Sequence, residues 1–153
     1  MKKRMFLTAL LLLAALCSGC GSLAPELPAD ATAFPCVEFV DPADPEDGYL
    51  ALEYGGRTYL PYGTLGGRLR KSDLGPCLGY PVQEGEAQRD VRICLLAADP
   101  AANYLVELFP EAVMQQPVFY RALDTAGREI NTPDWITPLE YGIWWNGPAG
   151  QGK

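Results

Sequence analysis

Beyond its first twenty residues, the chain contains no stretch long enough for an ordinary amphipathic helix. Over the whole sequence, 16 glycines and 14 prolines divide it into short apolar runs. Several of these runs alternate apolar and polar residues, which is the pattern of a half-buried strand. Short strands separated by glycine and proline turns predict a mainly β fold, namely a small antiparallel sandwich or barrel with one or two short helical turns.

The clearest local signal is a hairpin. Two strand-like runs, 49–54 and 57–60, flank Gly55-Gly56, and paired glycines tolerate the positive φ angles of a tight turn. Pro61 is expected to end the second strand, because proline lacks the backbone donor that a central strand needs. Further strands are expected at residues 37–40, 77–82, 91–97, 104–109, 118–122 and 141–145, helical turns at 110–116 and 132–136, and a break in regular structure at 41–48.

The first twenty residues have the three parts of a secretory signal. Lys2-Lys3-Arg4 is basic, residues 6–16 are apolar, and the small residues Ser18-Gly19 precede Cys20. The apolar run is too short to span a bilayer, which takes about 20 residues. A cysteine at the cleavage site predicts a lipoprotein signal, in which Cys20 is acylated and becomes the first residue of the mature chain. Ordinary secretion is the alternative.

This interpretation divides the chain into four parts. We expect a cleaved signal helix at residues 1–19, a flexible tether at 20–34, a single β-rich domain at 35–146 and a disordered tail at 147–153. The tether is predicted from a stretch rich in alanine, proline and leucine. Two acyl chains, such as palmitate, anchor a protein stably. The expected location is therefore the extracytoplasmic face of the cell membrane.

The charge balance limits the partners. The whole chain has a net charge of −7, and the predicted signal contains basic residues but no acidic ones. The mature chain is therefore more acidic than the whole. An acidic surface repels nucleic acid and anionic lipid headgroups. We expect contact with the membrane through the lipid alone, an envelope polymer or protein as the other partner, and no nucleic acid.

Histidine is absent, which excludes most familiar catalytic sites. Nucleophiles paired with histidine and most catalytic zinc sites need it, so no catalytic residue, metal or cofactor is predicted. A carboxylate pair for glycoside hydrolysis is left, with candidates Glu38, Glu53 and Glu107 on predicted strands. Alternation favours solvent-facing positions for all three. The acidic loop 41–47 misses the calcium-loop pattern, and the glycine-rich segment 63–68 lacks the ending of a phosphate loop.

Three cysteines are left once Cys20 is acylated. Cys77 and Cys94 both lie in strand-like runs, and thiols outside the cytosol tend to pair. A disulfide between these two is the favoured interpretation. Cys36 in place of either partner, and three buried reduced cysteines, are the alternatives.

Aromatic residues crowd the last part of the chain. Trp135, Trp144 and Trp145 would form a platform for sugar or peptide binding if they were exposed together. Filling the core of a small β domain is the favoured interpretation, because such domains bury aromatic residues readily. We expect Arg121 to lie against an aromatic face or an acidic side chain.

Four segments carry a resemblance to a known group of proteins. They are residues 59–65, 77–80, 103–106 and 119–127. Together they make the chain resemble a family of uncharacterised small lipoproteins from Gram-positive, largely gut-dwelling bacteria. The resemblance implies a small secreted β-rich domain. It implies no established activity and therefore no functional residue.

These observations predict a membrane-anchored lipoprotein that acts as a non-enzymatic binding or interaction module in the cell envelope. Two alternatives stay open. A carboxylate-dependent, glycan-active enzyme would need two acids that converge in a cleft. A solute-capturing lipoprotein associated with a transporter would need a deep pocket lined by apolar or aromatic residues.

Overall fold

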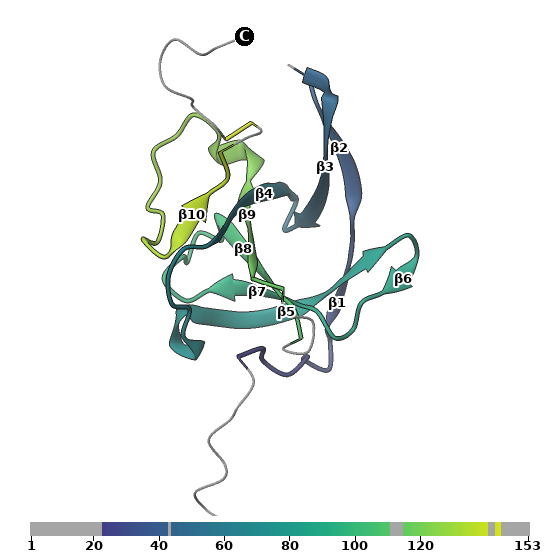
Figure 1. Cartoon of the computed structure of the whole chain (residues 1–153). Helices are drawn as coiled ribbons and strands as arrows, with labels where there is room; N and C mark the ends of the chain where they lie inside the picture. Colours follow the sequence, from purple (N-terminus) through teal and green to yellow (C-terminus); the bar gives the residue numbers. More distant parts are fainter. Residues whose placement is uncertain (1–22, 43, 111–114, 141–142, 145–153) are drawn as a thin grey trace, which may run out of the picture.

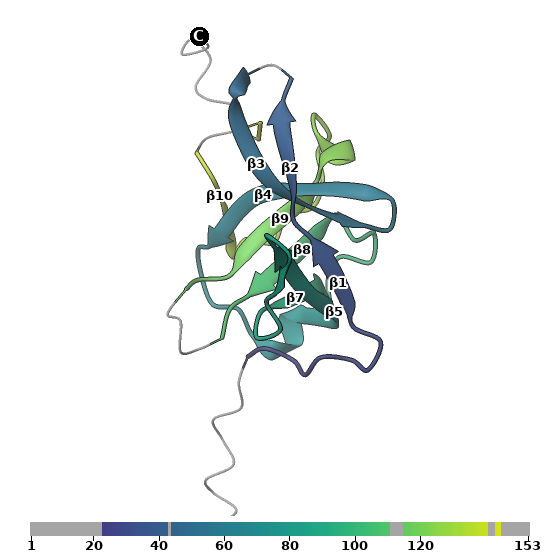
Figure 2. The same ribbon diagram turned by 90° about the vertical axis from the view of Figure 1, so that its right-hand side faces the viewer.

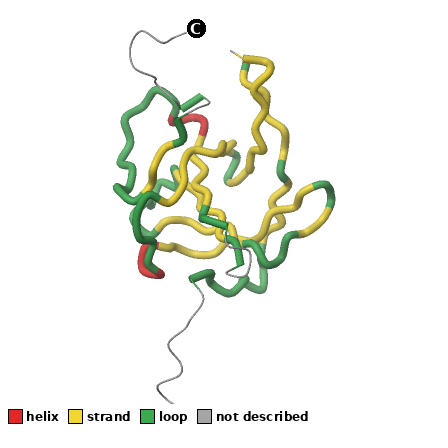
Figure 3. The backbone as a smooth tube through the Cα atoms, in the orientation of Figure 1, coloured by secondary structure: helices red, strands yellow, loops and turns green. Residues whose placement is uncertain are grey.

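The computed structural model describes residues 23–42, 44–110, 115–140 and 143–144 (Figure 1). The predicted signal helix, Cys20, Trp145 and the predicted tail lie outside these residues. Strands dominate the described residues, as Figure 3 shows, and the helical segments among them are short 3-10 turns. None of the described helices is long and apolar enough to cross a membrane. The prediction of a mainly β fold is confirmed.

The strands form one mixed sheet. Their order is β1-β5-β7-β8-β9-β4-β3-β2, with β6 beside β5 and β10 beside β4. The bounds are β1 Thr32–Pro35, β2 Val37–Asp41, β3 Asp44–Tyr54, β4 Arg57–Leu65, β5 Leu74–Gln83, β6 Glu86–Ala87, β7 Arg92–Leu96, β8 Tyr104–Leu108, β9 Val118–Ala122 and β10 Ile136–Pro138, with 3-10 turns η1 Lys71–Asp73 and η3 Leu123–Thr125.

The sheet is mixed because β1 runs parallel to β5, whereas the other described pairs are antiparallel. The prediction of an antiparallel sandwich or barrel is therefore wrong, and the sheet is open. Thr32 lies opposite Gly79 in the parallel pair. A Cβ atom at Gly79 would collide with the backbone of Thr32, so β1 approaches this closely only because a glycine is there.

Strands β1 and β2 are separated by Cys36 alone, yet they lie at opposite ends of the strand order. In Figures 1 and 2 they follow one another as a nearly continuous ribbon. The backbone N–H of Cys36 donates to the carbonyl of Val82 on β5, at 3.0 Å. The sheet therefore curves until one residue is enough to lead the chain from one of its ends to the other.

Hydrophobic cores cover both faces of the central strands. On β8, Tyr104, Val106 and Leu108 belong to the first core, while Leu105 belongs to the second. This explains why the strand is almost continuously apolar instead of alternating. The buried members of the first core are Tyr62, Leu69, Cys94, Leu96, Tyr104, Val106, Leu108, Phe119 and Ile136, and those of the second are Phe34, Leu52, Tyr59, Ile93, Leu105, Tyr120 and Ala122.

The folded part begins earlier than predicted. Leu23 and Ala24 pack against the first core, and Phe34 is fully buried in the second. The prediction of a flexible tether is therefore wrong for residues 23–34. The alanine and proline content of the segment indicates flexibility, but its few large apolar side chains are buried against the cores. Their burial stabilises an ordered conformation.

Strand boundaries differ from the prediction where prolines are accommodated at irregularities. Strand β4 continues past Pro61, and its register with β9 shifts between Pro61 and Gly63. A bulge tolerates the missing donor of a proline. In the same way, β3 begins at Asp44, inside the predicted break, and its register with β2 shifts between Val40 and Asp41. The predicted helical segment at 132–136 is a single hydrogen-bonded turn, in which the N–H of Ile136 donates to the carbonyl of Pro133 at 3.0 Å. It does not continue as a helix, because β10 begins at Ile136 and pairs with β4.

The predicted hairpin is confirmed, and a single arginine ties it to the rest of the domain. Gly55 and Gly56 have φ angles of 58° and 75°. The guanidinium of Arg57, the next residue, donates to the Asp124 carboxylate at 2.7 Å and to the carbonyl oxygen of Ala102 at 2.8 Å. Arg57 thus connects β4 to the loop before β8 and to η3.

Candidate functional site

A cavity of about 430 Å³ lies at the edge of the second core. Its wall combines apolar side chains from β3 and from the segments that flank β7 and β8 with polar groups from β5, β8 and β9. Leu50 on β3 is large, apolar and 46% exposed, so one side of the cavity is hydrophobic and open to solvent. The polar side chains on the wall of the cavity include those of Cys36, Gln83, Gln88, Asp90, Glu107 and Tyr120.

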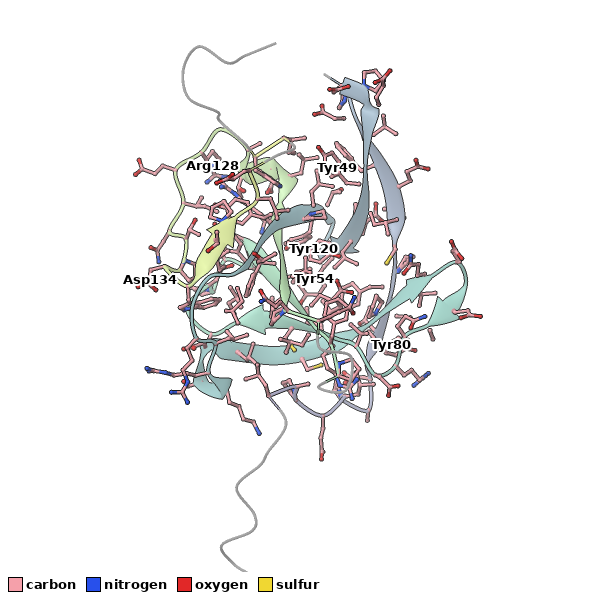
Figure 4. The ribbon with its side chains drawn as sticks, in the orientation of Figure 1. Tyr49, Tyr54, Tyr80, Tyr120, Arg128 and Asp134 are labelled. Carbon is pink, nitrogen blue, oxygen red and sulfur yellow. The ribbon has the colours of Figure 1, made fainter. Side chains whose placement is uncertain are left out.

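Glu107 and Tyr120 form the hydrogen-bonded pair of this cavity. The register of β8 and β9 pairs Leu105 with Tyr120 and Glu107 with Val118. Glu107 and Tyr120 are therefore diagonal neighbours on one face of the sheet. The Tyr120 hydroxyl donates to Oε2 of Glu107 at 3.0 Å. Figure 4 shows Tyr120 near the middle of the domain, close to Tyr54 in that view.

Burial sets the protonation of this pair. It raises the pKa of the half-buried Glu107 carboxyl, and the hydrogen bond from Tyr120 opposes only part of that effect. Burial and the nearby Glu107 raise the pKa of Tyr120 as well. Tyr120 therefore stays protonated as the donor, and Glu107 is the group that changes charge.

The thiol of Cys36 lines the same cavity. Burial and the nearby charge of Glu107 raise its pKa. The reactive form of a cysteine is the thiolate, so a raised pKa makes Cys36 a poor nucleophile. Asp90 stands at the exposed rim, and Gln83 and Gln88 add exposed amides. These groups can form hydrogen bonds with the polar part of a ligand, while the apolar side chains of the wall cover its apolar part. The Cys36 thiol is not activated as a nucleophile.

The structure separates the three candidate carboxylates. Glu38 on β2 and Glu53 on β3 are exposed, as alternation predicts. Glu107 faces the second core, so the solvent-facing interpretation is wrong for this residue. The reason is that β8 is covered on both faces. One signal in the sequence could have shown this, since Glu107 is the one charged residue in the apolar run 104–109. The sequence around Tyr120 and around Asp90 contains no comparable pattern that indicates a place on the cavity wall.

The described tryptophans pack against the first core. The Trp144 ring meets the Tyr62 ring edge-on, with centroids 5.8 Å apart, and its Nε1–H donates to the carbonyl of Pro61 at 2.9 Å. Trp135 contacts Phe119, with centroids 5.4 Å apart. Both rings are half-buried, as the core-filling interpretation expects. The third member of the predicted platform, Trp145, lies outside the described residues.

Arg121 lies against two of these aromatic rings, those of Tyr62 and Trp144. Its guanidinium carbon is 5.0 Å from the Trp144 ring centroid and 5.2 Å from that of Tyr62. The guanidinium also donates to the Thr125 hydroxyl and to two backbone carbonyls. The expectation that Arg121 lies against an aromatic face is confirmed, and these contacts hold the C-terminal segment against the sheet.

Cys77 and Cys94 lie opposite one another in the register of β5 and β7. Burial and the neighbouring Cys77 raise the pKa of Cys94. The structure contains Cys36, Cys77 and Cys94 as free thiols. The Cys77–Cys94 disulfide stays a prediction, for which the register supplies two adjacent positions. Among the described residues, no group of three or more acidic, cysteine or histidine side chains is placed to hold a metal ion.

Comparison of the chain with protein-family models, with curated proteins and with solved structures finds no match. The resemblance to a lipoprotein family therefore stays a prediction.

Proposed function

We propose that this protein is a lipid-anchored, extracytoplasmic binding module of the bacterial cell envelope, and that it holds a small ligand in the cavity around Glu107. The signal that ends at Cys20 supports the location. The observation that carries the binding role is the Glu107–Tyr120 pair at the wall of the cavity. Partial burial of a carboxyl costs free energy that a leucine at the same position would not cost. Carboxyl groups that line a cavity and have a shifted pKa are typical of functional sites.

Binding without catalysis is the simpler role for this set of groups. Raised pKa values keep the thiol of Cys36 and the hydroxyl of Tyr120 protonated. Neither is then available as a base or a nucleophile. The Cys36 thiol can donate a weak hydrogen bond to a ligand, and the Tyr120 hydroxyl, whose proton is donated to Glu107, can accept one.

The anchor is tested by mass spectrometry of the protein isolated from membranes. We expect residues 1–19 to be absent and a diacylglycerol to be attached at Cys20. The matched variant Cys20→Ala should be neither acylated nor held at the membrane. Protein that is recovered from the cytosol with Met1 and no acyl chain would overturn the proposed location.

The cavity is tested by NMR screening of a library of small neutral and charged compounds. We expect the compounds that bind to shift the backbone amide signals of Val91, Glu107 and Tyr120, which contribute to the cavity wall. Signals of the exposed hairpin at Gly55 and Gly56 serve as the internal control. Binders that consistently perturb another surface and leave the three wall residues unchanged would overturn the proposed site.

A glycan-active enzyme is the second candidate. Asp90 lines the same cavity as Glu107, so two carboxyls face one space. A carboxyl with a raised pKa is suited to act as a general acid. Hydrolysis of an envelope polymer by the purified protein, abolished by Glu107→Gln and by Asp90→Asn, would favour this function over binding alone.

A further inference from the structure

We infer that the cavity recognises its ligand through a cationic group, an ammonium or a guanidinium, that pairs with the carboxylate of Glu107. This inference rests on the proposed function, because it names the ligand chemistry of the same cavity. Three features lead to it: the charges of the lining residues, the incomplete pairing of Glu107, and the apolar side of the cavity.

Among the described residues, the charged side chains that line the cavity are acidic. Glu107 and Asp90 contribute carboxyls, and none of the described residues on the cavity wall is a lysine or an arginine. Arg89 and Arg92 are near in sequence, but both are engaged elsewhere. The Arg89 guanidinium lies 4.6 Å from the Tyr80 ring centroid and donates to the Tyr80 hydroxyl. The Arg92 side chain donates to the carbonyl oxygen of Pro25 at 2.9 Å.

The Glu107 carboxylate is therefore only partly compensated. Among the described residues, its side-chain hydrogen-bond donor is the neutral Tyr120 hydroxyl. Burial raises the pKa of Glu107, and among the described residues no cation contributes an opposing effect. A carboxylate that has already lost part of its hydration gains more from a cationic partner than one in free solution.

The rest of the cavity defines what carries the cation. Leu50 and Val91 offer apolar surface, and the exposed amides of Gln83 and Gln88 offer hydrogen bonds. A small amine with an apolar body matches this combination. A ligand with a carboxylate or a phosphate would meet Glu107 and Asp90, so the lining selects against anions as well as for cations.

The recognition should depend on pH through Glu107. The other titratable groups that line the cavity are Cys36, Tyr120 and Asp90. Raised pKa values keep Cys36 and Tyr120 neutral, and Asp90 lies at the exposed rim. The affinity for a cation should therefore increase as the pH rises through the pKa of Glu107, because only the ionised carboxyl pairs with it.

Three compounds with the same ring test the inference: cyclohexylammonium, cyclohexanol and cyclohexanecarboxylate. Their affinities for the whole protein, as purified from cells, are measured by NMR titration of backbone amides near pH 7. We expect cyclohexylammonium to bind about tenfold more tightly than cyclohexanol, since a charge-assisted hydrogen bond is worth roughly that factor. Cyclohexanecarboxylate should bind more weakly than both.

Variants assign the preference to one residue. Glu107→Gln keeps the size of the side chain and removes its charge, so most of the preference for the ammonium over the alcohol should then be lost. Glu53→Gln, at an exposed position on β3, is the matched control and should keep the full preference. Asp90→Asn should reduce the preference by less than Glu107→Gln, because Asp90 is exposed to solvent at the rim.

The outcomes separate the inference from the proposed function. Equal binding of ammonium and alcohol to the unmodified protein overturns the cationic ligand and leaves the cavity as a binding site. Binding of none of the three compounds counts against both. If Glu107→Gln does not fold, the affinities of the unmodified protein for the three compounds, and their dependence on pH, test the inference. Cyclohexylammonium stays charged between about pH 4 and pH 7, so a preference that does not weaken toward acid over this range overturns the role of Glu107.

Discussion

The Tyr120 hydroxyl donates to the Glu107 carboxyl across β8 and β9, and both groups are desolvated by the same core. Burial makes the pKa of Glu107 higher in the folded chain than in the unfolded chain. The folded state therefore holds this proton more tightly, and its contribution to stability is present at low pH and is lost as the pH rises through the folded pKa. The pair thus links the cavity to the stability of the domain.

The first prediction follows from this linkage. Relative to Glu107→Gln, the unmodified protein should lose stability as the pH rises above the value at which an unfolded glutamate titrates, about 4.3. Urea unfolding of both proteins at a series of pH values measures the difference, with Glu53→Gln as the exposed control. A difference between the two proteins that stays constant with pH would contradict the burial of Glu107.

The second prediction concerns Tyr120→Phe. Loss of the hydroxyl removes the hydrogen bond that lowers the pKa of Glu107, so this pKa should rise further. The free energy of unfolding should fall by about 1 kcal/mol, since a net hydrogen bond is lost while the ring is kept. NMR titration of the Glu107 carboxyl and urea unfolding measure the two effects. An unchanged pKa would show that the hydrogen bond does not form in solution.

The third prediction concerns Arg57. Its planar guanidinium donates hydrogen bonds to the Asp124 carboxylate and to the carbonyl groups of Ala101 and Ala102 at the same time. Arg57→Lys keeps the charge but cannot reproduce this geometry. It should lower the free energy of unfolding by about 1 kcal/mol after allowance for solvent exposure, nearly as much as Arg57→Ala. Full stability of Arg57→Lys would mean that charge alone matters here.

Asp124 provides the companion measurement. Arg57 lowers the pKa of this exposed carboxyl. Its contribution to stability is therefore present above the pKa of an unfolded aspartate and is lost as the pH falls through the folded pKa. Asp124→Asn should remove this acid-side dependence and cost less stability than Arg57→Ala, because the bonds from Arg57 to the carbonyls are retained.

The fourth prediction concerns the cysteines. Because Cys77 and Cys94 lie opposite one another, oxidation should join them and leave Cys36 as the free thiol. Closing a loop of roughly 15 residues stabilises a fold by about 3 kcal/mol. Intact mass and alkylation of the mature protein, with and without reductant, identify the pair. A disulfide that includes Cys36, or three thiols that all react, would contradict the pairing.

The fifth prediction separates packing from ligand binding at Trp144. Its ring contacts Tyr62 and Arg121 beside the first core, whereas Glu107 faces the second. Trp144→Ala should cost about 2 kcal/mol of stability, less than a fully buried aromatic, and should leave the ammonium preference of the cavity unchanged. Loss of ligand binding without loss of stability would instead support an aromatic platform.

Local patterns in the sequence predict the local parts of this fold. The hairpin at Gly55 and Gly56 follows from the φ angles that two adjacent glycines allow. Strand β1 has no comparable local pattern, because its hydrogen bonds depend on β5, which is distant in sequence. Strand β4 continues past Pro61, against the expectation from the sequence, because the irregularity there depends on the pairing with β9 and not on the proline itself.

The candidate site shows the same limit. Alternation states which residues share a face of a strand, but it does not state whether the other face is also covered. For β8 both faces are covered, so Glu107 points into the domain. The contact between Glu107 and Tyr120 depends on the register of β8 and β9. The position of Cys36 in the same cavity depends on the curvature that brings the two ends of the sheet together.

The most direct test of a cation-binding cavity is an NMR titration of the Glu107 side-chain carboxyl with and without cyclohexylammonium. We predict a pKa above the ordinary range of a glutamate for the protein alone, and a clear decrease when the ammonium is added. A carboxyl that titrates like an exposed glutamate, and does so equally in the presence of the ammonium, would contradict the account.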